Sequence, residues 1–301
     1  MGQTIIVSDL RKHYGQVHAV DGVSFSVEQG EFFGILGPNG AGKTTTLEII
    51  EGLREADSGT VEVLGERPWP RNHKLLTRIG VQLQATSFFE RLTAREQIRT
   101  FASLYGTDAK KADAMLATVG LEDKADTPAE KLSGGQAQRL SIACALVHDP
   151  DIVFLDEPSA ALDPQARRNL WDLLRSLNEG GRTVVLTTHY MDEAESLCDR
   201  VAIMDQGRIL ELGPPASLVR NLDAVTRISL ETGTLSVAGA VELAGPDDVV
   251  DDDGVSLTIA TRSPATVLTA LAERQLLTGL QVRGATLEDV FLNLTGREYR
   301  A

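Results

Sequence analysis

The sequence predicts an α/β fold followed by a small α+β domain, and three observations indicate this. The apolar runs EFFGIL, DIVFLD and TVVLTT, residues 31–36, 151–156 and 183–188, suit strands buried on both faces of a mainly parallel sheet. Helical patterns follow the first two runs, over residues 44–51 and 164–178. After about residue 223 the pattern changes to shorter strand-like runs around a single helix.

The segments that flank these runs indicate two subdomains. Residues 5–31 alternate between apolar and polar side chains and turn often, which predicts an antiparallel β subdomain. Between residues 85 and 150 strand signals vanish, and TAREQIRTFASLYG and DAKKADAMLATVG are helical, so we expect a helical subdomain at about 86–150. VAIMDQGRILELG, residues 201–213, predicts two strands around a turn at Gln206-Gly207.

The C-terminal part is predicted to be a separate α+β domain over residues 223–301, which leaves 1–222 for the first domain. VTRISLET, VSLTIAT and LQVRGAT are strand-like, and SPATVLTALAERQ is helical. The acidic run DDVVDDD, residues 247–253, is interpreted as a solvated hairpin turn, with a cation site as the alternative. A terminal helix is predicted with Thr286 as N-cap and with Leu287, Val290, Phe291 and Leu294 facing inward.

Composition excludes some classes of function. The net charge of −14 lacks the basic footprint of nucleic-acid binding, so we expect no nucleic-acid partner. No stretch approaches the roughly 18 apolar residues of a spanning helix, and the first residues lack the layout of a signal peptide. We therefore expect a cytoplasmic chain whose membrane part is another chain. Cys144 and Cys198 lie in apolar helical patterns, which predicts buried free thiols.

A glycine-rich loop follows the first apolar run. GPNGAGKT fits G-x-x-x-x-G-K-[ST] between a predicted strand and a predicted helix, the context that a phosphate-binding loop requires. Glycines let backbone N–H groups turn inward around phosphate oxygens, and the helix start adds its positive dipole end. Lys43 is expected to reach the terminal phosphates, and the Thr44 hydroxyl suits Mg²⁺. An ordinary strand-to-helix turn is the alternative. The loop residues predicted to bind nucleotide are Gly37, Pro38, Asn39, Gly40, Ala41, Gly42, Lys43, Thr44 and Thr45.

The second apolar run ends in two acidic residues. In DIVFLDEP, Asp156 stands at the carboxyl end of a buried strand, where ligands bind in open α/β sheets. Asp156 can hold Mg²⁺ through water, and Glu157 can polarise a water molecule for attack on a γ-phosphate. Alone, this segment could be a strand end followed by a helix cap. The glycine loop favours the catalytic interpretation.

The segment LSGGQAQRL, residues 132–140, begins a helix with a glycine pair. Ser133 is a good N-cap, and Gln136 three residues later completes the spacing of a capping box. A cap alone has no need of Gly134 and Gly135, because glycine costs roughly 1 kcal/mol relative to alanine within a helix. Bare N–H groups there suggest the close approach of an anion, with simple capping as the alternative.

Taken together, LSGGQ, GPNGAGKT and FLDEP resemble the motifs of the ATP-binding-cassette (ABC) ATPases. Other family motifs occur in the same order across the first two thirds of the chain. The resemblance implies that Tyr14 stacks on adenine, that Gln84 joins Mg²⁺ to the helical insertion, and that His189 contacts the γ-phosphate. Asp163 matches the aspartate of the loop after the catalytic glutamate. One residue departs from the family pattern, since Ala161 stands where a glycine usually precedes Leu-Asp.

What the resemblance implies is a P-loop ATPase core that binds ATP and Mg²⁺. The site residues it implies are Glu157, His189 and Lys43 for catalysis and Thr44, Gln84 and Asp156 for the metal. In this family two cassettes meet head to tail, so residues 133–136 would face the nucleotide of a second copy. A homodimer is the simplest form, and a heterodimer with a related cassette stays open.

The segments 79–97 and 284–298 resemble ATP-binding subunits of bacterial drug-resistance-type exporters, which pair with a separate transmembrane permease. The expected function is therefore ATP-driven export of a drug, antibiotic or lipid-like substrate, with the chain held peripherally on the cytoplasmic side of the membrane. The C-terminal domain would be an accessory domain. An importer ATPase is the nearer alternative, and a non-transport ABC ATPase of translation or DNA repair is the more distant one.

Overall fold

The computed structural model describes residues 2–84, 88–160, 162–222 and 225–296. Of these, the residues up to Pro215 form one compact unit, and the described residues from Ala216 to 296 form another. The predicted boundary at 222/223 lies just after the short helix α8 (Pro215–Asn221), and a functional division at that point stays a prediction. Within the described ranges, no helix is long and apolar enough to cross a membrane.

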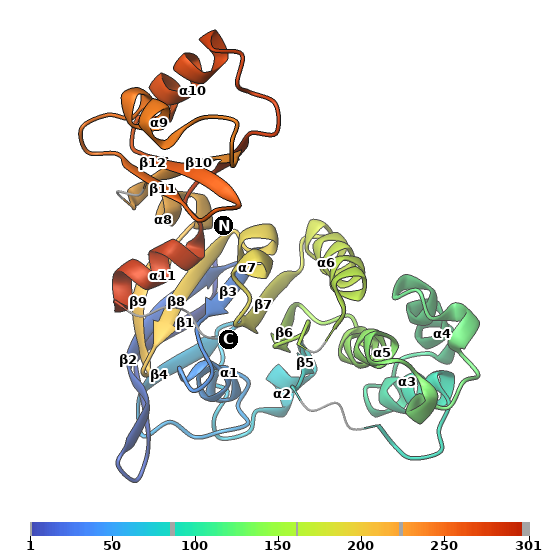
Figure 1. The fold of residues 1–301 in the computed structure, drawn as a ribbon. Coiled ribbons are helices and arrows are strands. Elements are labelled where there is room, and N and C mark those ends of the chain that lie inside the picture. The colour runs from blue at the N-terminus through green and yellow to red at the C-terminus, as the bar shows by residue number, and fades with distance from the viewer. Residues whose placement is uncertain (1, 85–87, 161, 223–224, 297–301) are drawn as a thin grey trace. The chain divides into compact units, whose positions relative to one another are not determined.

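A six-stranded sheet forms the centre of the first unit (Figure 1). Its order is β5 (Ile79–Gln82), β6 (Ile152–Asp156), β7 (Thr183–Thr188), β3 (Phe32–Leu36), β8 (Arg200–Asp205) and β9 (Arg208–Gly213). All neighbours pair in parallel except β8 and β9. Every residue of β3, β6 and β7 is buried, which is why these strands appear as unbroken apolar runs rather than alternating ones. The predicted parallel core is confirmed.

An antiparallel sheet of three strands packs beside this core. Its order is β2 (Val17–Glu28), β1 (Gln3–Tyr14) and β4 (Ser58–Val63), as the alternating N-terminal segment predicts. Helix α1 (Lys43–Ile50) contacts β2 and β4 of this sheet and β6 and β7 of the other. The rings of Phe25 and Phe33 stack with centroids 5.0 Å apart and join the two sheets in one apolar core.

The helical insertion has an apolar core of its own. Its elements are α3 (Ala94–Leu104), α4 (Ala109–Thr118), the short 3₁₀ turns η1 (Glu122–Lys124) and η2 (Ala129–Lys131), and α5 (Gly134–Leu146). Helix α2 (His73–Leu76) precedes β5, and α6 (Pro164–Glu179) and α7 (Met191–Leu197) follow β6 and β7. Cys144 and Cys198 are buried free thiols, as predicted. Burial raises the pKa of Cys144 to about 12.

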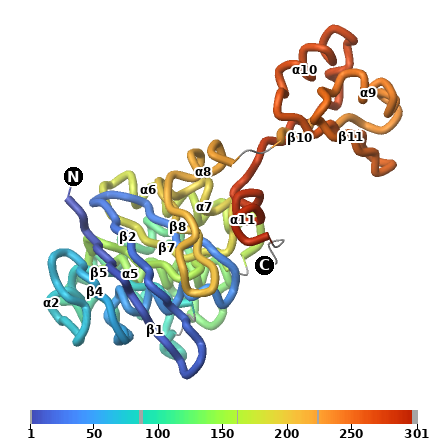
Figure 2. The backbone as a smooth tube through the Cα atoms, turned by 90° about the vertical axis from the view of Figure 1, so that its left-hand side faces the viewer, coloured from blue at the N-terminus to red at the C-terminus, as the bar shows by residue number. Residues whose placement is uncertain are grey.

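The second unit carries a four-stranded antiparallel sheet with helices α9 and α10, which lie together in Figure 2. The order is β11 (Val249–Asp252), β12 (Ser256–Thr261), β10 (Thr226–Glu231) and β13 (Gln281–Arg283). The helices of this unit are α9 (Val237–Leu243), α10 (Pro264–Glu273) and α11 (Leu287–Thr295), together with α8. The acidic run forms β11 and the turn after it, where Asp253 accepts backbone N–H bonds from Val255 and Ser256. The run thus belongs to a β-hairpin, but most of it forms the strand β11 rather than the predicted turn.

One prediction for the terminal helix is wrong. Leu287, Val290 and Phe291 are buried, as expected, but Leu294 is 37% exposed. Helix α11 ends at Thr295, and the next residue, Gly296, has a left-handed backbone with φ of 64°. Leu294 thus lies in the last turn, beyond the buried stripe.

Candidate active site

The loop between β3 and α1 uses its glycines in different ways. A Cβ at Gly37 would lie 2.1 Å from the carbonyl oxygen of Met204, and one at Gly42 would lie 2.1 Å from that of Ala19. Both positions are closed to any side chain. Gly40 has φ of +80°, and a Cβ there would meet nothing within 4 Å. The loop is therefore fixed to the protein at Gly37 and Gly42 and presents an open surface at Gly40.

Lys43 is held over this loop. Its Nζ donates to the carbonyl oxygens of Gly37 at 2.8 Å and Pro38 at 3.1 Å, and it lies 3.1 Å from Oε1 of Glu157. The side chain is 4% exposed. A buried ammonium group needs acceptors, and here loop carbonyls and a carboxylate supply them.

Asp156 ends β6 beside the start of α1. Thr44 Oγ1 donates to Asp156 Oδ1 at 3.2 Å, and Thr187 Oγ1 donates to the same oxygen. Burial raises the pKa of Asp156, and the hydrogen bonds from the two threonines oppose that rise. The parallel register places Asp156 directly beside Thr187 of β7, so topology brings these oxygens together.

Glu157 is the centre of the hydrogen-bond network. Its φ is +47°, an uncommon value for a residue with a side chain. Its N–H donates to the carbonyl oxygen and to Oγ1 of Thr187, at 3.1 and 3.0 Å. Its Oε2 lies 3.1 Å from Nδ1 of His189 and accepts a bond from Gln84 Nε2 at 3.3 Å. Three side chains from separate parts of the chain therefore contact this one carboxylate, His189 and Gln84 at Oε2 and Lys43 at Oε1.

The structure brings together Lys43, Gln84, Asp156, Glu157 and His189, which lie far apart in the sequence. The reason is sheet order, because β6, β7 and β3 are neighbours and their carboxyl ends meet at one edge. Gln84 lies two residues after the end of β5, the strand that pairs with β6 on the side away from β7.

The LSGGQ segment begins helix α5 as a complete capping box. Gln136 N–H donates to Ser133 Oγ at 3.3 Å, and Ser133 N–H donates to Gln136 Oε1 at 3.0 Å. A Cβ at Gly134 would meet nothing within 4 Å, whereas one at Gly135 would lie 3.2 Å from Cβ of Ala166. Gly134 is thus bare toward open space, while Gly135 allows α6 to pack closely.

Asp163 and Tyr14 occupy separate places. Asp163 is the N-cap of α6, accepting the Ala166 N–H at 2.8 Å. Tyr14 ends β1 and is 43% exposed. The Arg54 guanidinium lies 5.4 Å from the centre of its ring, and Lys12 Nζ lies 5.8 Å from it. Ala161, where the sequence departs from the family pattern, lies outside the described residues.

The loop and the carboxylates fit a nucleotide with Mg²⁺. The glycine surface is open at Gly40 while Lys43 stands over the loop. Thr44, Asp156 and Gln84 offer hydroxyl, carboxylate and amide oxygens, the hard ligands that Mg²⁺ prefers. The donor set therefore matches a phosphate chain with its metal.

Comparison with known proteins identifies the family. The ABC transporter family profile matches residues 20–160. A Nod factor export ATP-binding protein I of Ralstonia nicotianae is 40% identical over 311 residues, covering 100% of this chain and 97% of its own. The chain belongs to the ATP-binding proteins of ABC transporters. It is accordingly an ABC-type, ATP-binding ATPase.

Further relatives of this ABC protein agree. The linearmycin resistance ATP-binding protein LnrL of Bacillus subtilis is 39% identical, covering 97% of this chain and 98% of its own. An ABC transporter cassette solved in its ADP conformation has a TM-score of 0.67 at 25% identity, over 74% of this chain and 95% of that one. A dimeric cassette in a post-hydrolysis state with ADP and Pi has a TM-score of 0.63 at 30% identity, over 70% and 98%. The solved cassettes thus span a share similar to the first unit, while the sequence relatives extend over both.

Sequence reasoning missed two residues of the site. The hydroxyl of Thr187 donates a hydrogen bond to Asp156 and accepts one from the Glu157 N–H. Glu51, directly after α1, is buried, and its pKa is raised well above the ordinary value, by burial first and by the charge of Asp156 second. The polar end of TVVLTT, next to His189, was the available signal for Thr187. Glu51 gave none, since it looks like an ordinary polar residue at a helix end.

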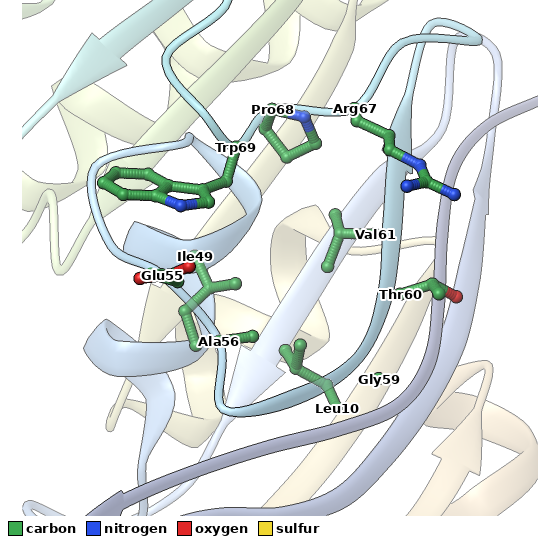
Figure 3. Close-up of a pocket in the computed structure, with 10 residues that line it drawn as sticks. All are labelled: Leu10, Ile49, Glu55, Ala56, Gly59, Thr60, Val61, Arg67, Pro68 and Trp69. Carbon is green, nitrogen blue, oxygen red and sulfur yellow. The ribbon is translucent and has the colours of Figure 1, made fainter.

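A separate pocket of about 170 Å³ lies beside α1 and β4 (Figure 3). Trp69 forms one wall, and Ile49 and Leu10 lie across from it. None of its ten lining residues belongs to the predicted nucleotide site.

Proposed function

We propose that this chain is the ATP-hydrolysing subunit of an exporter. It would couple the binding and hydrolysis of ATP to the export of a drug, antibiotic or lipid-like substrate through a separate membrane permease. The observation that supports this most strongly is the convergence of Lys43, Gln84, Glu157 and His189 behind the glycine loop.

In this proposal Lys43 binds the terminal phosphate oxygens. Its ammonium group is placed over the loop by the carbonyl oxygens of Gly37 and Pro38, and a phosphate oxygen would replace one of its three present acceptors. Tyr14 stacks on the adenine, and the remaining loop N–H groups bind phosphate oxygens. Thr44, Asp156 and Gln84 hold Mg²⁺, which when bound neutralises phosphate charge.

Glu157 acts as the base that polarises the attacking water. Its carboxylate is held by Lys43, Gln84 and His189, and its backbone by Thr187. His189 lies on the same carboxylate oxygen as Gln84 and would contact the γ-phosphate. Because Gln84 belongs to the segment leading into the helical insertion, it links the state of the site to that subdomain.

In this proposal helix α5, which begins with the LSGGQ segment and is called the signature helix from here on, completes the nucleotide site of a second copy. Gly134 and the first N–H groups of α5 offer a second anion-binding site, in addition to the one that Lys43 and the phosphate-binding loop provide. A solved cassette of this family is dimeric with ADP and Pi, which supports a head-to-tail homodimer here. Two identical sites would then form across a two-fold axis.

Export is favoured over import by the relatives. The names Nod factor export and linearmycin resistance both describe export-type proteins, and the similarity covers nearly the whole of each chain. Attachment to the cytoplasmic face of the membrane through the permease belongs to the same proposal.

The test is the Glu157→Gln variant. We expect it to bind ATP as the wild type does but to hydrolyse it at least roughly 100-fold more slowly, since general-base catalysis is lost. ATP binding is measured by equilibrium titration and hydrolysis by phosphate release. The matched control is Glu122→Gln, an exposed glutamate of the helical subdomain, which should hydrolyse ATP normally. Normal turnover by Glu157→Gln would overturn the role of that residue.

A further inference from the structure

The tip of the β1–β2 hairpin carries two of the chain's five histidines. His13 and His18 are directly opposite each other in the antiparallel register. Their rings meet edge to face, with centroids 4.3 Å apart and planes at 86°. His18 is exposed and His13 half-buried, so ring nitrogens of both are within reach of solvent.

A β-bulge adds a carboxylate to this pair. Lys12 pairs with Val20 and His13 with His18, which leaves Ala19 as an extra residue on β2. An extra residue shifts the alternation of the strand, and it brings Asp21 to the side of His18. One ligand atom from each of His13, His18 and Asp21 lies within 4.8 Å of the other two.

A second carboxylate orients His13. Asp57 Oδ2 lies 3.2 Å from His13 Nδ1 and also accepts the His13 backbone N–H at 2.7 Å. A carboxylate on Nδ1 keeps the proton there and directs the lone pair of Nε2 outward, the arrangement typical of metal-bound histidines.

We propose that His13, His18 and Asp21 form a binding site for a divalent transition-metal ion such as Zn²⁺. Two imidazoles and one carboxylate suit zinc-class ions better than Mg²⁺, which prefers oxygen ligands. Ligand atoms in a tetrahedral zinc site lie roughly 3.3 Å apart, so small side-chain rotations close the site. Water completes the coordination.

Two arginines beside Asp21 affect how strongly the proposed site binds a metal ion. Arg11 donates to Asp21 Oδ1, and Arg208 Nε donates to Asp21 Oδ2 at 2.9 Å. Arg208 Nη2 also donates to Oδ2, so both lone pairs of that oxygen are used, and only Oδ1 keeps an acceptor position for the ion. The neighbouring positive charges weaken the attraction, and we therefore expect reversible binding rather than a permanently loaded structural site.

The test is calorimetric titration of the full chain with Zn²⁺, without nucleotide and with excess Mg²⁺ to occupy other oxygen sites. We expect one Zn²⁺ per chain. His18→Asn should weaken binding more than about tenfold, and Asp57→Asn, which removes the orienting charge, by roughly tenfold. His18 is exposed, so this substitution should leave the fold intact.

The matched control is His73→Asn, which removes an exposed histidine at the start of α2. It should bind Zn²⁺ like the wild type. The proposal would be overturned if the wild type bound no Zn²⁺, or if His18→Asn and His73→Asn both bound it with wild-type affinity.

Discussion

Single residues decide the shape of the phosphate-binding loop. Gly42 has φ of +100°, and a Cβ there would lie 2.1 Å from Ala19 O and 2.9 Å from Met204 Cε. Gly40 also has a positive φ but faces open space. At Gly40 only the backbone conformation favours glycine, whereas at Gly42 both the conformation and the packing require it.

Gly42→Ala should destabilise the first unit by roughly 2–4 kcal/mol, because overpacking adds to backbone strain. Gly40→Ala should cost only about 1–2 kcal/mol, from the left-handed backbone alone. Thermal unfolding of the two variants checks this difference. Equal melting temperatures would show that the contact at Gly42 relaxes without cost.

Glu193 is a buried carboxylate outside the predicted site. It lies in α7, is fully buried, and accepts a hydrogen bond from Trp171 Nε1 at 3.1 Å. Hydrogen bonds from the hydroxyls of Thr188 and Ser159, and from Trp171, favour its ionised form. Burial raises the pKa of Glu193 above its ordinary value of 4.5.

The raised pKa of Glu193 makes the free energy of unfolding depend on pH. The carboxyl group contributes stability that is fully present below pH 4.5 and is lost as pH rises through the folded-state pKa. Glu193→Gln removes the titration and keeps an acceptor for Trp171. Its melting temperature relative to wild type should therefore increase as pH rises above 4.5.

Melting temperatures measured across this pH range check the prediction. The exposed residue Glu179 supplies the control, since Glu179→Gln should give a difference from wild type that changes little with pH. A pH-independent difference for Glu193→Gln as well would contradict the raised pKa.

At the scale of elements, two helices of the insertion start with the same device. Thr93 and Glu96 form a capping box on α3, and Ser133 and Gln136 form one on α5. Only the second has glycines in its first turn. The comparison separates capping, which both boxes provide, from anion binding, which we propose for α5 alone.

Ser133→Ala and Thr93→Ala should each cost about 1 kcal/mol of stability. Ser133→Ala should in addition reduce ATPase activity roughly tenfold or more, because in the proposed dimer it alters a group that faces the partner's nucleotide. Thr93→Ala should leave the activity close to wild type. Thermal unfolding and phosphate release measured on both variants check this. Equal ATPase activities would show that the LSGGQ segment only caps its helix.

The sequence was most informative where a strand was buried on both faces. β3, β6 and β7 were predictable as unbroken apolar runs, and α6 as a periodic pattern beginning at a proline. Helix α9 was not predicted, because Gly239 interrupts a short alanine-rich segment whose main signal is the Ser236 N-cap. Leu294 fits the helical period, but only the position of Gly296 places it beyond the buried stripe.

Sequence motifs indicated the residues of the candidate site but not the hydrogen bonds between them. Motifs located Lys43, Asp156 and Glu157, yet the hydrogen bonds of Glu157 to Gln84 and His189 depend on strand order. Thr187 was missed although the polar end of TVVLTT lies next to His189, because a threonine at a strand end is not specific to a nucleotide site. Its role follows from the register that places it beside Asp156.

At the scale of the whole molecule, the central claim is that one chain completes the site of an identical chain. The phosphate-binding loop and the signature helix are both present once. A C₂ pair would use each twice, and the Glu157→Gln variant should hold the pair together because hydrolysis no longer resets it.

The most direct measurement is the light-scattering mass of Glu157→Gln with and without Mg-ATP. We expect the mass of the 32.4 kDa monomer without nucleotide and twice that mass with it. Adding Ser133→Arg, which places a bulky charge at the signature helix, should keep the protein monomeric while ATP still binds. A Glu157→Gln protein that binds ATP yet stays monomeric would contradict the claim that an identical copy completes the site.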